Sequence, residues 1–135
     1  MGARSMVETQ RTTPDRKLEV VFWAPGLTST ELAERLGPIE FDEIADERDG
    51  AGVAVMVSKA PRDAATRDHF ADLWSRASVA FEKIAEADPG TYRCLVRLVQ
   101  YVRADDDFPG FTIEPEWVKA VAAFDGFFDI DQYIL

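Results

Sequence analysis

The stretch GFTIEPEWVKAVAAFDGFFDIDQYIL, residues 110–135, predicts the last helix and the last strand of the fold. Glu114 can cap a helix that begins at Pro115, because the first helical position needs no backbone N–H. Three apolar residues recur at helical spacing before Gly126 ends this helix: Val118, Val121 and Ala122. The pattern then changes to a period of two, which predicts a strand that runs to Leu135 and buries its apolar end in a sheet.

The chain of 135 residues has the length of one domain. Residues 1–16 show no periodicity, and we expect them to be a flexible lead-in to a single domain over residues 17–135. Residues 18–24, LEVVFWA, are rich in β-branched and aromatic side chains, which is typical of a strand. Residues 52–58, GVAVMVS, predict a second, buried strand.

Two further helices are indicated between these segments and the end of the chain. Thr28 and Glu31 have the spacing of a capping box, which predicts a short helix that ends at Gly37. A long helix is expected over residues 66–87. Its apolar stripe is spaced by three and four residues and indicates core packing: Phe70, Leu73, Trp74, Ala77, Phe81 and Ile84.

Residues 91–103 predict the longest strand, and alternation separates its two faces. The face expected to join the core carries Tyr92, Cys94, Val96, Leu98 and Val102. The other face carries Arg93, Leu95, Arg97, Val99, Tyr101 and Arg103. The order of elements favours an α+β two-layer single domain, with helices packed on one face of a mostly antiparallel or mixed sheet. No strand ends in a glycine-rich turn that opens a helix, which disfavours a doubly wound fold.

Three groups of residues resemble the small bacterial proteins of the family called domain of unknown function 4279. They are Leu32, Leu36 and Gly37 in the short helix; Gly110, Phe111, Ile113, Pro115 and Glu116 before the last helix; and Asp129, Asp131 and Tyr133 in the last strand. The resemblance covers residues 18–135 and departs between residues 39 and 50, where this chain carries acids. It implies the same order of strands and helices, and the family name implies no activity.

The composition limits the classes of partner. The formal net charge of −10 repels phosphates, so we expect neither nucleic acid nor an anionic membrane as partner, and the charge suits a basic protein. We find no apolar stretch long enough for a membrane span and no secretory signal, so we expect a cytoplasmic protein. Cys94 is the only cysteine, which leaves no internal disulfide and indicates a buried thiol.

Residues that could support catalysis or metal binding are few. His69 is the only histidine, and we place no serine or cysteine beside it, so we expect it at the surface or at a helix boundary. The carboxylates of residues 105–107, and those of Asp129 and Asp131, lack the glycine and distal glutamate of a calcium loop. We therefore predict no catalytic residues, no metal and no cofactor, and the sequence favours a binding protein over an enzyme.

The arginines of the long strand have two interpretations. Arg93, Arg97 and Arg103 can form cross-strand ion pairs with Asp129 and Asp131, which is the ordinary outcome in a sheet. Alternatively they line a groove that binds a carboxylate or phosphate, which would make the protein a small-molecule binding protein or an enzyme.

An acidic stretch between residues 39 and 50 is the predicted partner surface. Its candidate residues are Phe41, Asp42, Glu43, Asp46, Glu47 and Asp49. Charges around a few apolar contacts are the arrangement by which bacterial immunity proteins bind basic toxins. We therefore expect a non-enzymatic, acidic protein-binding domain of bacterial type, immunity-like or regulatory towards a basic partner. The alternative is a solvated loop that only keeps the protein soluble.

Overall fold

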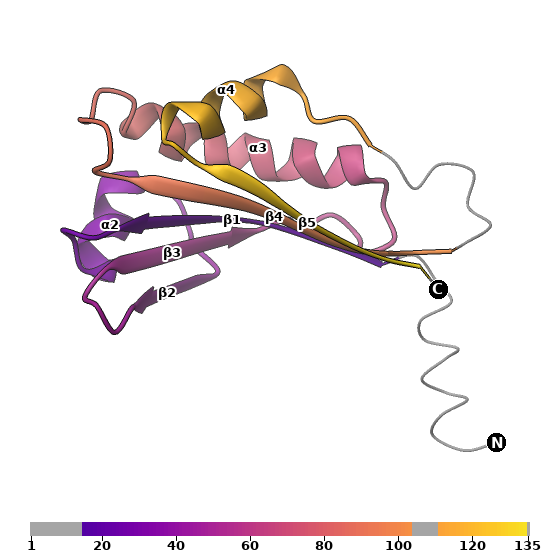
Figure 1. Cartoon of the computed structure of the whole chain (residues 1–135), viewed down its shortest axis with the longest axis horizontal. Helices are drawn as coiled ribbons and strands as arrows, with labels where there is room; N and C mark the ends of the chain where they lie inside the picture. The colour runs from indigo at the N-terminus through magenta and orange to yellow at the C-terminus, as the bar shows by residue number, and fades with distance from the viewer. Residues whose placement is uncertain (1–14, 104–110, 135) are drawn as a thin grey trace, which may run out of the picture.

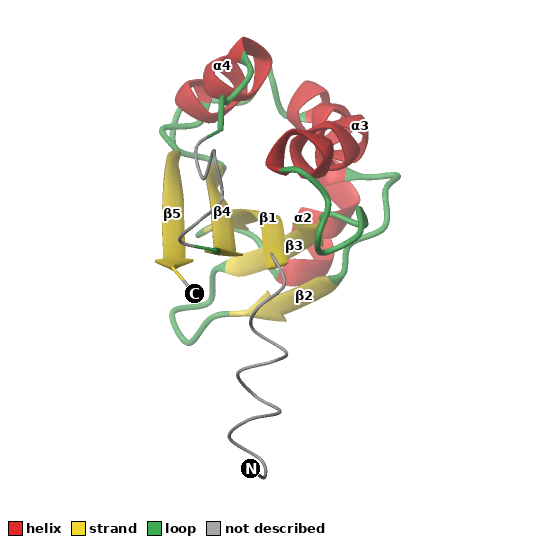
Figure 2. Cartoon of the chain, turned by 90° about the vertical axis from the view of Figure 1, so that its right-hand side faces the viewer, coloured by secondary structure: helices red, strands yellow, loops and turns green. Residues whose placement is uncertain are grey.

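The computed structural model of the chain describes residues 15–103 and 111–134, in which three helices pack on a five-stranded sheet (Figure 1). In chain order the elements are β1 (Asp15–Ala24), α2 (Ser29–Leu36), β2 (Glu43–Asp46), β3 (Gly52–Val57), α3 (Thr66–Lys83), β4 (Arg93–Val102), α4 (Pro115–Ala123) and β5 (Phe127–Ile134). Helices α3 and α4 lie together above the sheet (Figure 2). The predicted α+β two-layer architecture is confirmed.

The sheet has the strand order β2-β3-β1-β4-β5 and is mixed. β1 lies at its centre and pairs antiparallel with β3 and β4, and β2 pairs antiparallel with β3. β5 is parallel to β4, since α4 returns the chain to the same end of the sheet. Gly126 permits this return, because a Cβ there would stand 2.5 Å from the carbonyl oxygen of Cys94.

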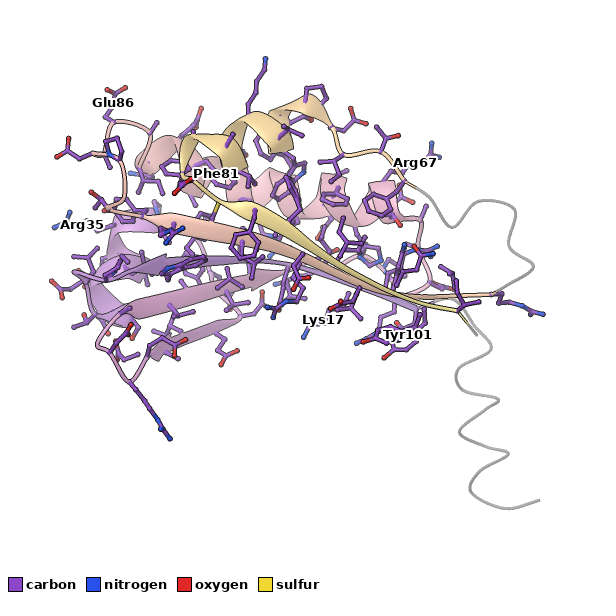
Figure 3. The ribbon with its side chains drawn as sticks, in the orientation of Figure 1. Lys17, Arg35, Arg67, Phe81, Glu86 and Tyr101 are labelled. Carbon is purple, nitrogen blue, oxygen red and sulfur yellow. The ribbon has the colours of Figure 1, made fainter. Side chains whose placement is uncertain are left out.

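The core lies between the sheet and the helices. Even-numbered residues of β1, β3 and β4 face the helices, and most of them are fully buried: Leu18, Val20, Phe22, Ala24, Ala54, Met56, Cys94, Val96 and Leu98. Phe81 of α3 points down onto them and contacts Phe22 edge to face at 5.2 Å (Figure 3). Odd-numbered residues of the same strands point to the opposite side, where Lys17 and Tyr101 project from the sheet (Figure 3). We call this side the open face.

The capping box that starts α2 is present as predicted. The Thr28 hydroxyl accepts the N–H of Glu31 at 3.2 Å, and the Glu31 carboxylate accepts the N–H of Thr28 at 3.1 Å. The hydrogen bond from the Thr28 backbone lowers the pKa of Glu31. This reciprocal pair fixes the helix at one end of the sheet.

The predicted face of the last helix is correct at Val121 and wrong at Val118 and Ala122. Val118 is 47% exposed and Ala122 is exposed, whereas Trp117 and Val121 are buried. Trp117 sets the rotation of α4, because its ring fills the space between α3 and α4 and its Nε1–H donates to the carbonyl of Phe70 at 3.3 Å. In contrast to the predicted core position, Trp74 is only partly buried against this cluster.

The two ends of the domain also differ from the prediction. β1 begins at Asp15, inside the expected lead-in, because Arg16 is held by the Gln100 side chain at 3.2 Å and the Ala64 carbonyl at 3.1 Å. The last strand was predicted to be buried, and this prediction is wrong for the residues that the structure describes, up to residue 134. β5 is an edge strand, and Ile134 is 58% exposed there.

Candidate functional site

The open face is the surface on which the candidate residues come together. No helix among residues 15–103 and 111–134 covers it, and it combines apolar with charged side chains. Its apolar part lies towards the end of the sheet where β4 begins: Val21, Trp23, Val53, Val55, Leu95 and Phe127. These six residues come from four neighbouring strands, so the sheet itself holds them in register.

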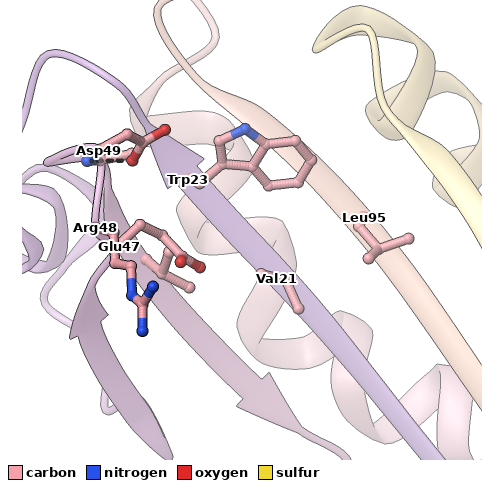
Figure 4. Close-up of a pocket in the computed structure, with 8 residues that line it drawn as sticks. Val21, Trp23, Glu47, Arg48, Asp49 and Leu95 are labelled. Carbon is pink, nitrogen blue, oxygen red and sulfur yellow. Dashed lines mark hydrogen bonds between the residues drawn. The ribbon is translucent and has the colours of Figure 1, made fainter.

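A hollow of about 640 Å³, open to solvent, lies on this apolar part. We call it the open-face hollow. It is lined by Val21, Trp23, Glu47, Arg48, Asp49, Ala51, Val53 and Leu95. Figure 4 shows the Trp23 ring, Val21 and Leu95 along the strands and Glu47 and Asp49 on the turn between β2 and β3. The hollow therefore has an apolar floor, and one rim carries the carboxylates of Glu47 and Asp49 together with the guanidinium of Arg48.

Three acids of the predicted partner surface stabilise the local backbone. Asp42 accepts the N–H of Val57 at 2.7 Å, and Asp49 accepts the N–H of Ala51 at 3.1 Å. Asp46 accepts both the N–H of Ser29 at 2.7 Å and its hydroxyl at 3.2 Å, at the N-terminus of α2. The negative charge there also suits the dipole of the helix.

The remaining candidates of the stretch lie differently. Phe41 is partly buried and packs against the core. Glu43 is exposed opposite Val55, on the open face, and Glu47 lines the hollow. Glu43, Glu47 and the rim carboxylate of Asp49 are thus the acids placed to meet a partner.

Sequence reasoning missed the floor of the hollow. Trp23, Val21 and Val53 occur in segments that are apolar at nearly every position, so they read as buried on both faces. The available signal was the alternation: Lys17 and Glu19 share the parity of Val21 and Trp23, which marks that face of β1 as partly solvated.

The predicted ion pairing of the arginines is confirmed for Arg97. Its Nε lies 3.2 Å from Asp129 on β5, and its Nη1 lies 3.4 Å from Glu19 on β1. Asp131 stands opposite Val99 and makes no ion pair with any residue that the structure describes.

The other two predicted arginines have different surroundings. Arg93 lies 3.7 Å from Asp125 and stacks over the Trp23 ring, with 5.6 Å between the guanidinium carbon and the ring centroid. Arg103 follows the end of β4 and is exposed. The open-face hollow is lined by Arg48 and by none of these three. The anion site at Arg93, Arg97 and Arg103 stays a prediction.

His69 lies in the first turn of α3, at the expected helix boundary, but it is not at the surface. The imidazole is buried, with 1% exposure, and its Nδ1 lies 2.8 Å from the hydroxyl oxygen of Ser58, a neighbour that the sequence did not indicate. Burial, with the charge of Arg16, lowers the pKa of His69. The Ser58 hydroxyl oxygen also accepts the N–H of Ala60 at 3.2 Å. His69 is buried, whereas Ser58, directly after β3, is only partly buried.

Other chemical groups are limited within the described ranges. Burial raises the pKa of the Cys94 thiol to about 12, so it stays protonated and unreactive. Within residues 15–103 and 111–134 no three His, Cys, Asp or Glu side chains are grouped to hold a metal ion, and residues 105–107 lie outside these ranges. The helices described are too short or too polar to cross a membrane.

Comparison with known proteins found no matching family model, no matching curated protein and no matching solved structure. The resemblance to domain of unknown function 4279 therefore stays a prediction.

Proposed function

We propose that the chain is a non-enzymatic, acidic protein-binding domain that binds a basic segment of another protein on its open face. The observation that carries the proposal is the open-face hollow, with its floor of Trp23, Val21 and Leu95 and with Glu47 and Asp49 on its rim. An immunity-like or regulatory role in a bacterial cytoplasm is the setting we propose for it.

A lysine or arginine side chain of the partner fits the chemistry of this hollow. Its aliphatic stem can lie along the apolar floor while its charged end reaches a carboxylate at the rim. Trp23 adds an aromatic surface at the same place, although Arg93 already occupies part of it. Apolar contact and charge thus act on one side chain, as in the central contacts of protein interfaces.

The net charge of −10 supports the same kind of partner over a longer range. A field of one sign attracts a basic protein and mainly raises the rate of encounter. Since Asp42, Asp46 and Asp49 each accept a backbone N–H, the acids near the hollow without such a bond are Glu43 and Glu47. This division makes the proposal testable with two substitutions.

The test compares charge reversal on the two sides of the sheet. The double variant Glu43→Lys/Glu47→Lys is matched by Glu82→Lys/Glu86→Lys, which makes the same change in net charge on the helix side, where Glu86 points outward (Figure 3). Each immobilised chain is exposed to a lysate of the host cell, and bound proteins are eluted with salt.

We expect a basic protein that the parent and the helix-side variant retain and the open-face variant loses. Association of that purified protein should also slow as salt increases, because exposed charges are screened. Equal retention by all three chains would contradict the proposal.

A further inference from the structure

Among the strands that the structure describes, β5 has the most exposed apolar side chains. Six large apolar side chains are exposed among the residues described, and four of them belong to this strand: Phe127 at 51%, Ile130 at 42%, Tyr133 at 49% and Ile134 at 58%. β5 is eight residues long and, within residues 15–103 and 111–134, pairs with β4 alone, so a row of its backbone N–H and C=O groups faces away from the described sheet. Such an edge can pair with another strand.

The opposite edge of the sheet is shorter and carries less apolar surface. β2 is only four residues long and begins and ends with acids, Glu43 and Asp46. Its helix-side end is also attached to α2 through the bonds of Asp46 to Ser29. Short edges resist the addition of a strand, whereas β5 is twice as long as β2 and contains no proline.

Side chains of β5 form two rows of different chemistry. The helix-side row is largely apolar: Phe128, Ile130, Gln132 and Ile134. The open-face row carries two acids between aromatic residues: Phe127, Asp129, Asp131 and Tyr133. Asp129 shares Arg97 with Glu19, and Asp131 forms no ion pair among the described residues. The open-face row thus keeps an uncompensated negative charge.

We infer that this edge accepts an extended segment of the basic partner as a sixth strand, in which lysine or arginine alternates with apolar residues. Alternation is required because successive side chains of a strand point to opposite faces. The basic residues would stand beside Asp129 and Asp131, and the apolar residues beside Ile130 and Ile134. The inference rests on the proposed function and names the form that the partner takes.

A second copy of the chain suits this edge less well. An antiparallel copy that places Ile130 opposite Ile130 also places Asp129 opposite Asp131 twice, and like charges directly opposite destabilise a sheet. Two chains of net charge −10 also repel each other. Charge complementarity therefore selects a basic strand.

The test uses two synthetic peptides of identical composition, Lys-Val-Lys-Val-Lys-Val-Lys and Lys-Lys-Val-Val-Val-Lys-Lys. Both are titrated into the full chain, and binding is followed by NMR shifts and by hydrogen exchange of backbone amides. We expect the alternating peptide to bind about tenfold more tightly and to protect amides of β5. The variant Asp131→Lys should weaken it about fivefold, while Asp68→Lys on α3, with the same charge change, should have little effect.

The other outcomes overturn the inference in distinguishable ways. Equal binding of the two peptides, with shifts around Glu43 and Glu47, would leave the proposed function standing and remove the role of β5. No binding of either peptide at millimolar concentration would also overturn the strand addition, while retention of a basic protein in the lysate experiment would still decide the proposed function. Concentration-dependent self-association that Ile130→Lys abolishes would show that a second copy occupies the edge.

Discussion

The helix-covered face and the open face of the sheet are formed by alternate residues of the same strands, yet they differ in chemistry. On β1, Leu18, Val20 and Phe22 have no exposed surface, whereas Glu19 and Trp23 on the other side are partly exposed. The first row is apolar from Leu18 to Ala24, and the second mixes apolar residues with charges. The side chains of the helix-covered face thus contribute most of the stability, and those of the open face are available for contact with a binding partner.

The largest effect should come from removing the largest fully buried side chain of the helix side. Trp117→Ala should lower the free energy of unfolding by roughly 3 to 5 kcal/mol, because a large buried aromatic leaves a cavity. Trp23→Ala, on the open face, should cost roughly 1 to 2 kcal/mol, since less of its surface leaves water. Urea unfolding of the two variants measures the contrast, and equal losses would mean that the open face is as much a core as the other.

The same comparison corrects an expectation about Trp74. The position of Trp74 on the predicted stripe suggested that Trp74→Ala would lower the free energy of unfolding by as much as the loss of a fully buried tryptophan. The side chain is, however, only partly buried. Trp74→Ala should therefore fall between the other two tryptophan variants.

A smaller effect should separate the structural acids from those available for binding. Asp46→Ala should cost roughly 1 to 2 kcal/mol, because it removes two hydrogen bonds at the N-terminus of α2. Glu47→Ala should change stability by less than about 0.5 kcal/mol, as is usual for surface residues without such bonds. Chemical denaturation tests this, and a stable Asp46→Ala variant would place Asp46 among the acids available to a partner.

These contrasts show how much of the molecule could be predicted from its sequence. Local signals were sufficient for the capping box of Thr28 and for the alternation of β4, because both depend on neighbours within a few residues. The rotation of α4 was missed because Trp117 and Val118 are both apolar, and only the space left by α3 chooses between them. The role of Asp46 depends on Ser29, 17 residues away, which no local pattern reports.

The candidate site depended even more on long-range contacts. Arg97 and Asp129 could be paired by charge, and their contact at 3.2 Å agrees with that expectation. The hollow, however, joins β1, β3, β4 and the turn after β2, so its existence follows from the strand order. The exposure of β5 likewise follows from its place at the edge.

His69, which is buried on the helix side of the sheet, predicts that the free energy of unfolding depends on pH. Its ordinary pKa is 6.5 and the folded value is lower, so the unfolded chain binds the additional proton first as pH falls. Stability should therefore be complete above about pH 6.5 and decrease below it, towards the folded pKa. Unfolding between pH 7 and 5 measures the slope, and His69→Gln should flatten it. An unchanged slope in that variant would assign the dependence to other groups.

The smallest effect should come from the arginines of the open face. Arg93→Leu/Arg97→Leu should cost well under ~1 kcal/mol, because partly exposed ion pairs contribute little to stability. If the arginines only pair with Asp125, Asp129 and Glu19, added phosphate should leave the melting temperature of the parent unchanged. An anion site would instead raise that temperature through binding to the folded state, and the double variant would lose the rise. We expect no rise, because each arginine already has a carboxylate within 3.7 Å to compete with an added anion.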